Sequence, residues 1–198
     1  MLNNNQILNN SNLNILRNKY FFILCLYLKN KTNSDFISEF LFIGYKYNYL
    51  ILNINTLIKN LKKILVLIAK ISSKNGNILV LHTSNKVLNN LLQINCKKLQ
   101  INFLLESENN PQDNLIKSLK KFPDLVISFD YKANLYFLMK LAHFNVPVIC
   151  FTDFLSRNIV NNMFYYLIIN NNSLYINILL IYLVFNSISN NKQYFLNK

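Results

Sequence analysis

The clearest pattern of apolar and polar positions lies in residues 123–153, PDLVISFDYKANLYFLMKLAHFNVPVICFTD. Residues 125–129 form a short apolar run rich in β-formers, which is typical of a strand buried on both faces. Residues 133–144 then carry apolar side chains at helical spacing, with Asn145 as a C-cap, and residues 146–151 form a second buried run. The pattern therefore predicts two parallel strands joined by a right-handed helical crossover.

The same alternation of buried runs and one-sided helical runs extends along the rest of the chain. Further strands are predicted at residues 49–54, 78–81, 100–105 and 164–169, and further helices at 57–74, 86–94, 114–121 and 174–188. Asn55 or Thr56 is expected to cap the first of these helices, and Gly76 to end it. The alternation predicts an α/β fold: a doubly wound, mostly parallel sheet with helices on both faces, Rossmann-like.

Composition divides the chain into three parts. Residues 1–48 are an Asn-rich tail and an N-terminal arm, in which we expect one or two short helices. Residues 49–189 form the α/β domain, and residues 190–198 a polar C-terminal tail.

The last predicted helix, residues 174–188, is apolar on more than one face. Its length of about 22 Å falls short of a hydrocarbon core of about 30 Å. We therefore expect it to pack across the sheet, and we expect no stable membrane insertion.

The composition points to an unusual source for the gene. About a fifth of the 198 residues are Asn, Lys far outnumbers Arg, Gly and Pro are scarce, and Trp is absent. The enriched residues have codons made mainly of A and T, which indicates an AT-rich genome such as that of an organelle. Cys25, Cys96 and Cys150 are scattered, so neither a disulfide framework nor a metal site is indicated, and they are expected to be buried.

The chain is strongly basic, with a net charge of +13 and only 8 acidic residues. Such a balance favours a polyanion such as nucleic acid as the partner, although an AT-rich gene also places Lys on surfaces without function.

Four polar residues follow predicted strands, where ligands bind in doubly wound sheets: His82, Glu106, Asp130 and Asp153. Short polar residues end strands in many proteins for hydrogen-bonding reasons alone. The two glycines, Gly44 and Gly76, cannot build a glycine-rich phosphate loop, and no nucleophile elbow or H-E-x-x-H motif occurs. We therefore expect no enzymatic activity, no cofactor and no small-molecule substrate.

Several short strings resemble the small-subunit ribosomal protein S-two family. That family carries a string close to P-D-h-h-h-h-h-D, a helix, and N-h-P-h-h-h-h-h-D, where h is apolar. The matching positions here are Pro123, Asp124, Asp130, Asn145, Pro147 and Asp153. The segments LFIGYKYNYLILNINTLI, GNILVLHTSN and YLIINNNS resemble further family segments in the same order, while the family's H-F-G-H segment is missing. Its long helical hairpin is reduced here to residues 109–121.

The resemblance implies a non-enzymatic, structural constituent of the small ribosomal subunit. Together with the AT-rich composition, it leads us to expect a mitochondrial ribosome and a gene in the organelle genome. Such a protein binds small-subunit rRNA and neighbouring small-subunit ribosomal proteins and takes part in translation in the matrix. We predict that its phosphate contacts come from the arm and one basic helix face: Arg17, Lys19, Lys29, Lys31, Lys46, Lys59, Lys62, Lys63, Lys70 and Lys74.

Two alternatives remain open. The chain could be a small doubly wound nucleotide-binding domain or hydrolase that uses the four strand-end residues His82, Glu106, Asp130 and Asp153. It could also be a peripheral membrane protein that uses its basic surface and apolar ends.

Overall fold

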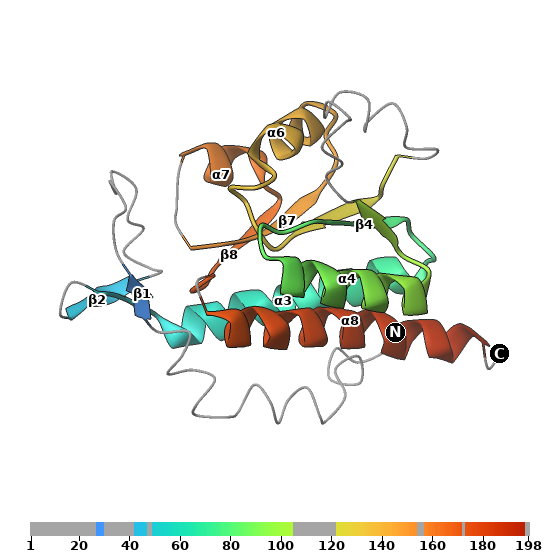
Figure 1. Cartoon of the computed structure of the whole chain (residues 1–198), viewed down its shortest axis with the longest axis horizontal. Helices are drawn as coiled ribbons and strands as arrows, with labels where there is room; N and C mark the ends of the chain where they lie inside the picture. The colour runs from blue at the N-terminus through green and yellow to red at the C-terminus, as the bar shows by residue number, and fades with distance from the viewer. Residues whose placement is uncertain are drawn as a thin grey trace.

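The structure is a computed structural model that describes residues 27–29, 42–46, 49–104, 122–153, 157–171 and 173–196 (Figure 1). Glu106, the predicted loop and helix at residues 105–121, and most of the predicted N-terminal arm lie outside the described residues.

A five-stranded sheet forms the centre of the molecule. Its strands are β4 (Ile78–Leu81), β5 (Asn102–Leu104), β6 (Leu125–Ser128), β7 (Val148–Thr152) and β8 (Tyr165–Ile168). They are arranged in the order β5-β4-β6-β7-β8, and all neighbouring pairs are parallel. The predicted doubly wound α/β fold is thus confirmed, and so is the parallel pair of the central strand–helix–strand unit.

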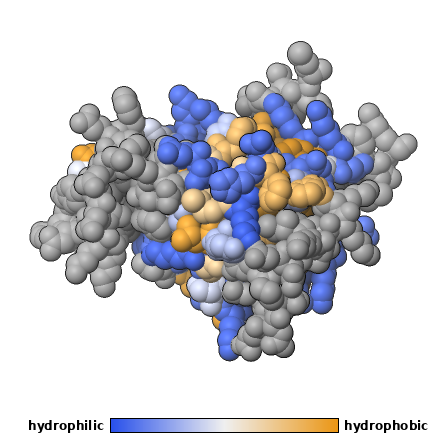
Figure 2. All heavy atoms as spheres, turned by 90° about the horizontal axis from the view of Figure 1, so that it is seen from above, coloured by the Kyte–Doolittle hydropathy of each residue, from blue (hydrophilic) through white to orange (hydrophobic). Residues whose placement is uncertain are grey.

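Helices cover both faces of this sheet, because successive strand residues point to opposite sides. Ile78 and Val80 pack into the cluster formed with α3 (Ile54–Ser73), α4 (Lys86–Leu99) and α8 (Leu174–Leu196). Leu79 and Leu81 pack into the cluster formed with α6 (Leu135–His143) and α7 (Arg157–Asn162). Seen from above, the α6 and α7 face exposes hydrophobic side chains between hydrophilic ones (Figure 2). The short helix α7 was not predicted from the sequence.

The helix α8 contacts both α3 and α4 and packs into the core on their side of the sheet (Figure 1). Ile176, Leu180 and Val184 are fully buried, which accounts for its apolar composition. The helix extends to Leu196, beyond its predicted end and into the polar segment 190–198. Among the described residues, no helix has the length and apolar character that a membrane span needs.

The prediction for residues 49–54 was wrong about their partners. This segment forms β3 (Tyr49–Leu52), which lies in a separate antiparallel sheet with β1 (Tyr27–Lys29) and β2 (Phe42–Lys46). An apolar run predicts a strand but does not choose its neighbours, which is the physical reason for the error. The described residues of the N-terminal arm are likewise strands, so the helices expected there are wrong for residues 27–29 and 42–46.

Three helices end in the same way, with a residue in the left-handed conformation that satisfies the last carbonyls. Asn75, Gln100 and Asn145 have φ near +55°. In each case its amide and the following one bond back to the last turn, as Asn145 N does to Ala142 O and Val146 N to Leu141 O. The C-cap of α6 is Phe144, and Asn145, predicted as the C-cap, follows it in the left-handed conformation. Gly76 does not take this conformation, but follows Asn75 and donates its amide to Ile71 O.

The first turn of α3 also differs from the prediction. Asn53, rather than Asn55 or Thr56, is the N-cap, and its side chain accepts a 3.1 Å hydrogen bond from Asn55 N. The Thr56 hydroxyl donates to Asn53 O at 2.8 Å, so two hydrogen bonds between side chains and backbone hold this turn.

Candidate functional site

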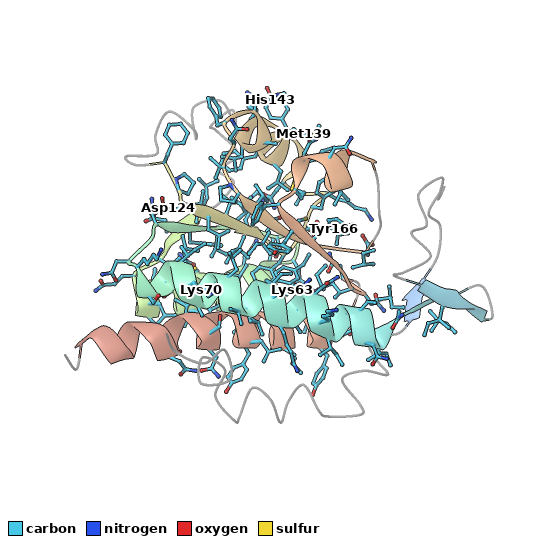
Figure 3. All side chains as sticks on the ribbon, turned by 180° about the vertical axis from the view of Figure 1, so that it is seen from behind. Lys63, Lys70, Asp124, Met139, His143 and Tyr166 are labelled. Carbon is cyan, nitrogen blue, oxygen red and sulfur yellow. The ribbon has the colours of Figure 1, made fainter. Side chains whose placement is uncertain are left out.

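A stripe of lysines runs along the outer face of α3. The apolar stripe of this helix is buried, as predicted, and Leu61, Ile64, Leu65 and Ile68 are fully enclosed. The predicted RNA-binding lysines of α3 are all exposed: Lys59, Lys62, Lys63, Lys70 and Lys74. Their spacing places them on one side of the helix over about 22 Å. We call these five residues the lysine stripe; Figure 3 shows α3 in front, with Lys63 and Lys70 along it.

None of the lysines of the stripe forms an ion pair within the described part of the chain. The described ion pair, Lys132 with Asp153, belongs to another part of the molecule. Five positive charges without an ion-pair partner among the described residues make a strongly positive surface, which attracts polyanions.

The other predicted RNA-binding residues are only partly described. Lys29 and Lys46 end β1 and β2, and the backbone register places both opposite Tyr49 on the strand between them. Lys29 and Lys46 therefore lie at the same level along their strands, at one end of the three-stranded sheet. Tyr49 begins β3, the strand that leads into α3. Arg17, Lys19 and Lys31 lie outside the described residues.

A second candidate site lies at the carboxyl ends of the parallel strands. The chain crosses from β5 back over β4 to β6, so the topological switch point lies between β4 and β6. Ligands of doubly wound proteins bind at this point. Here an open hollow of about 570 Å³ is lined by residues that include Ser84, Asp130, Lys132, Asp153 and Asn177.

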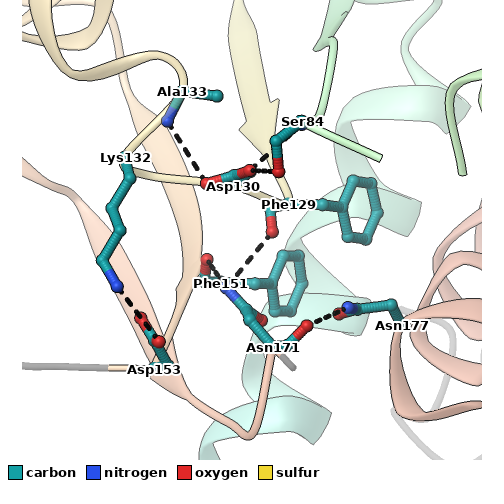
Figure 4. Close-up of polar contacts among 9 residues, drawn as sticks. All are labelled: Ser84, Phe129, Asp130, Lys132, Ala133, Phe151, Asp153, Asn171 and Asn177. Carbon is teal, nitrogen blue, oxygen red and sulfur yellow. Dashed lines mark hydrogen bonds and ion pairs between the residues drawn. The ribbon is translucent and has the colours of Figure 1, made fainter. Parts of the chain in front are cut away.

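Three hydrogen bonds hold the carboxylate of Asp130 in the turn after β6 (Figure 4). Its Oδ2 accepts hydrogen bonds from Ser84 Oγ at 2.6 Å and Ser84 N at 3.1 Å, and its Oδ1 accepts one from Ala133 N at 3.2 Å. Burial raises the pKa of this carboxyl, but the hydrogen bonds from Ser84, Ala133 and the amide of Lys132 outweigh it, so the pKa lies below its ordinary value. Asp130 therefore acts as an ionised acceptor that fixes the turn, as its position at a strand end predicted.

Asp153 lies on the same hollow and is bound differently. Its Oδ2 accepts a 3.3 Å contact from Lys132 Nζ, whose side chain is 67% exposed (Figure 4). Residues 154–156, which follow Asp153, lie outside the described residues.

The structure does not gather all four strand-end residues predicted for the alternative enzyme. Asp130 and Asp153 line one hollow, whereas His82 is 7% exposed and is not part of its lining. The backbone of His82 joins the turn, since its carbonyl accepts a 2.7 Å bond from Asn134 Nδ2. Glu106 lies outside the described residues.

Two asparagines of the hollow were not predicted as site residues. Asn171 Nδ2 donates to Phe129 O at 3.4 Å and Phe151 O at 3.2 Å, and Asn177 Nδ2 donates to Asn171 O at 2.8 Å (Figure 4). These bonds tie the start of α8 to the ends of β6 and β7. The signal for Asn177 was present in the sequence, as a single polar residue within an apolar helix.

No group of three or more His, Cys, Asp or Glu side chains that could hold a metal ion occurs among the described residues. Cys96 and Cys150 are free and buried, as predicted, and burial raises the pKa of Cys96 to about 12. Cys25 lies outside the described residues.

Comparisons with family models and with curated proteins assign no function to these sites. No protein-family model matches the chain, and a search of curated proteins gives no match.

Proposed function

We propose that the chain is a structural, non-enzymatic constituent of the small subunit of a mitochondrial ribosome, where it binds small-subunit rRNA. The observation that carries this proposal is the lysine stripe of α3, whose charges lack carboxylate partners in the described chain. Lysines meet phosphate oxygens without reading base sequence, so the stripe suits an RNA backbone.

The resemblance to the ribosomal S-two family supports the same proposal, because its matching positions build the fold. Asp124 Oδ2 accepts a 2.7 Å bond from Asn77 N, Asp130 fixes the turn after β6, and Asn145 ends α6 in the left-handed conformation. These roles suit a domain that serves as a docking body for RNA and neighbouring ribosomal proteins. The AT-rich composition favours the mitochondrial matrix as its location.

A nucleotide-binding or hydrolytic function is the second candidate, and the hollow of about 570 Å³ at the switch point favours it. The bonds to Asp130 weaken it, because both carboxylate oxygens already accept hydrogen bonds from the protein.

The test compares two triple variants with the same loss of charge. Lys63→Gln, Lys70→Gln and Lys74→Gln remove part of the stripe, while Lys86→Gln, Lys97→Gln and Lys98→Gln remove exposed lysines of α4. Binding of the full chain to small-subunit rRNA is measured across a range of salt concentrations, and incorporation is followed on organelle ribosome gradients.

We expect the stripe variant to lose affinity at least tenfold, and its salt slope to fall by about two to three, while the α4 variant changes little. Equal effects of the two variants would remove the stripe as the interface. Absence of the chain from ribosomal subunits at low salt would overturn the proposed function itself.

A further inference from the structure

A second open hollow, of about 680 Å³, lies beside the lysine stripe at the amino ends of β7 and β8. Its apolar lining comes from three segments: Leu67 and Ile71 of α3, Val146 and Pro147 before β7, and Met163 and Phe164 before β8. It is separate from the hollow of about 570 Å³ at the carboxyl ends of the strands, which we call the strand-end hollow, because the two share no lining residue.

One exposed aromatic ring, that of Phe164, belongs to the lining of this hollow. Phe164 is 61% exposed although it belongs to the lining, and Phe144, next to the lining residue Asn145, is 55% exposed. Phe144 in turn lies 5.6 Å from Phe122, which is 56% exposed. Apolar surface left exposed beside an open hollow is typical of a binding surface.

Polar amides complete the lining of the hollow. Asn145, Asn161 and Asn162 all contribute to it, and each amide offers both a donor and an acceptor. Asn162 Nδ2 contacts Met139 Sδ at 3.2 Å, a weak acceptor. An apolar surface with amides around it matches a nucleobase, which has an apolar face and a polar edge.

The lysine stripe supplies the charge that a nucleotide requires. Lys63 and Lys70 are four and three positions from Leu67, and Lys74 is three positions from Ile71, which makes them neighbours on the helix surface. The carboxylate described near this edge, Asp124, is engaged with Asn77 N at 2.7 Å.

We propose that this hollow binds unpaired RNA nucleotides, with a base stacked on Phe164 and phosphates held by the lysine stripe. The proposal rests on the proposed RNA-binding function and deepens it, because it assigns single-stranded RNA as the ligand. Aromatic rings that stack bases, placed next to cations, are the usual means of binding single strands. The positive border favours RNA over an apolar segment of a neighbouring protein as the occupant.

The test separates stacking from charge. Phe164→Leu keeps an apolar side chain but removes the aromatic face, and Tyr175→Leu is the matched control, because Tyr175 is 60% exposed on α8 and is not part of this hollow. Binding of the full chain to a labelled single-stranded oligouridylate and to an RNA duplex of equal phosphate number is measured by fluorescence anisotropy.

We expect Phe164→Leu to weaken binding of the single strand about tenfold and to leave duplex binding unchanged, while Tyr175→Leu alters neither. Unchanged single-strand binding by Phe164→Leu would overturn the stacking proposal, even if lysine variants still weaken RNA binding and the proposed function stands. Failure of the wild-type chain to bind either RNA would count against the proposed function instead.

A photoreactive benzoylphenylalanine at position 164 tests the same site inside the ribosomal particle. Cross-links to rRNA would support the proposal, and cross-links to a neighbouring protein alone would overturn it.

Discussion

Ser84 Oγ donates a 2.6 Å hydrogen bond to Asp130 Oδ2, and this pair joins the carboxyl ends of the neighbouring strands β4 and β6. The two residues lie far apart in the sequence, yet the parallel pairing brings them to one edge. The bond links the ends of the two strands at the switch point of the sheet. It supports a structural role for the carboxylate over a catalytic one.

The first prediction concerns the acid stability that Asp130 provides. Because its pKa is lowered in the fold, the ionised group stabilises the protein above its unfolded pKa of about 3.8. That stability is lost as the pH falls through the folded pKa. Urea unfolding between about pH 6 and pH 2.5 should therefore show a shallower loss of unfolding free energy for Asp130→Asn than for the wild type. Ser84→Ala should reduce the slope in the same direction, and a wild-type slope in Asp130→Asn would exclude this role.

Asp153→Asn should have little effect on stability or assembly. The pair with Lys132 is largely exposed on the lysine side, and such ion pairs contribute about 1 kcal/mol or less. The variant should enter ribosomal particles about as well as the wild type, as measured on sucrose gradients. A hydrolytic or transfer activity that is lost in this variant would instead favour the enzymatic alternative.

Gly76→Ala should destabilise the fold through a steric contact. A Cβ atom at this position would lie 2.6 Å from Ile71 Cγ2 and 3.1 Å from Ile71 O. The neighbouring turn must move, at a cost of about 1–3 kcal/mol in unfolding free energy. Gly44→Ala is the control, since no described residue lies within 4 Å of its added Cβ, and it should change stability by less than about 0.5 kcal/mol. Equal effects of the two variants in urea unfolding would contradict this account.

Gln100→Gly should stabilise the protein. Gln100 ends α4 with φ 52° and ψ 48°, a left-handed conformation that costs a side chain with a Cβ about 1–2 kcal/mol. Glycine removes this cost but gains freedom in the unfolded chain, so the net gain should be about 0.5–1 kcal/mol in chemical denaturation. Asn145→Gly should gain less, because asparagine adopts this conformation more readily. A loss of stability in Gln100→Gly would show that its side chain has another role.

The buried thiols should resist modification in the folded protein. Burial raises the pKa of Cys96 to about 12, and burial together with the negative charge of Asp130 raises that of Cys150 well above its ordinary value. In a Cys25→Ser background, a thiol reagent at pH 8 should label neither residue in native buffer and both in urea. Rapid labelling before unfolding would mean that these sites open to solvent.

Local pattern was enough to predict the central strand–helix–strand unit. The buried runs of β6 and β7, the one-sided helix between them and the left-handed end at Asn145 all depend on near neighbours in the chain. The two faces of α3 were also predictable, because helical spacing alone separates Leu61 and Ile64 from Lys63 and Lys70.

Only the tertiary structure decided which segments meet. The run at residues 49–52 has the composition of a core strand, yet it pairs with β1 and β2, since strand partners are chosen by contacts distant in sequence. The same holds for the strand-end hollow, where Asp130 and Asp153 meet Asn177, and for the second hollow, where Leu67 meets Val146 and Phe164. A sequence determines the side chains and their local spacing, whereas a site arises from the packing of separate elements, which no local pattern encodes.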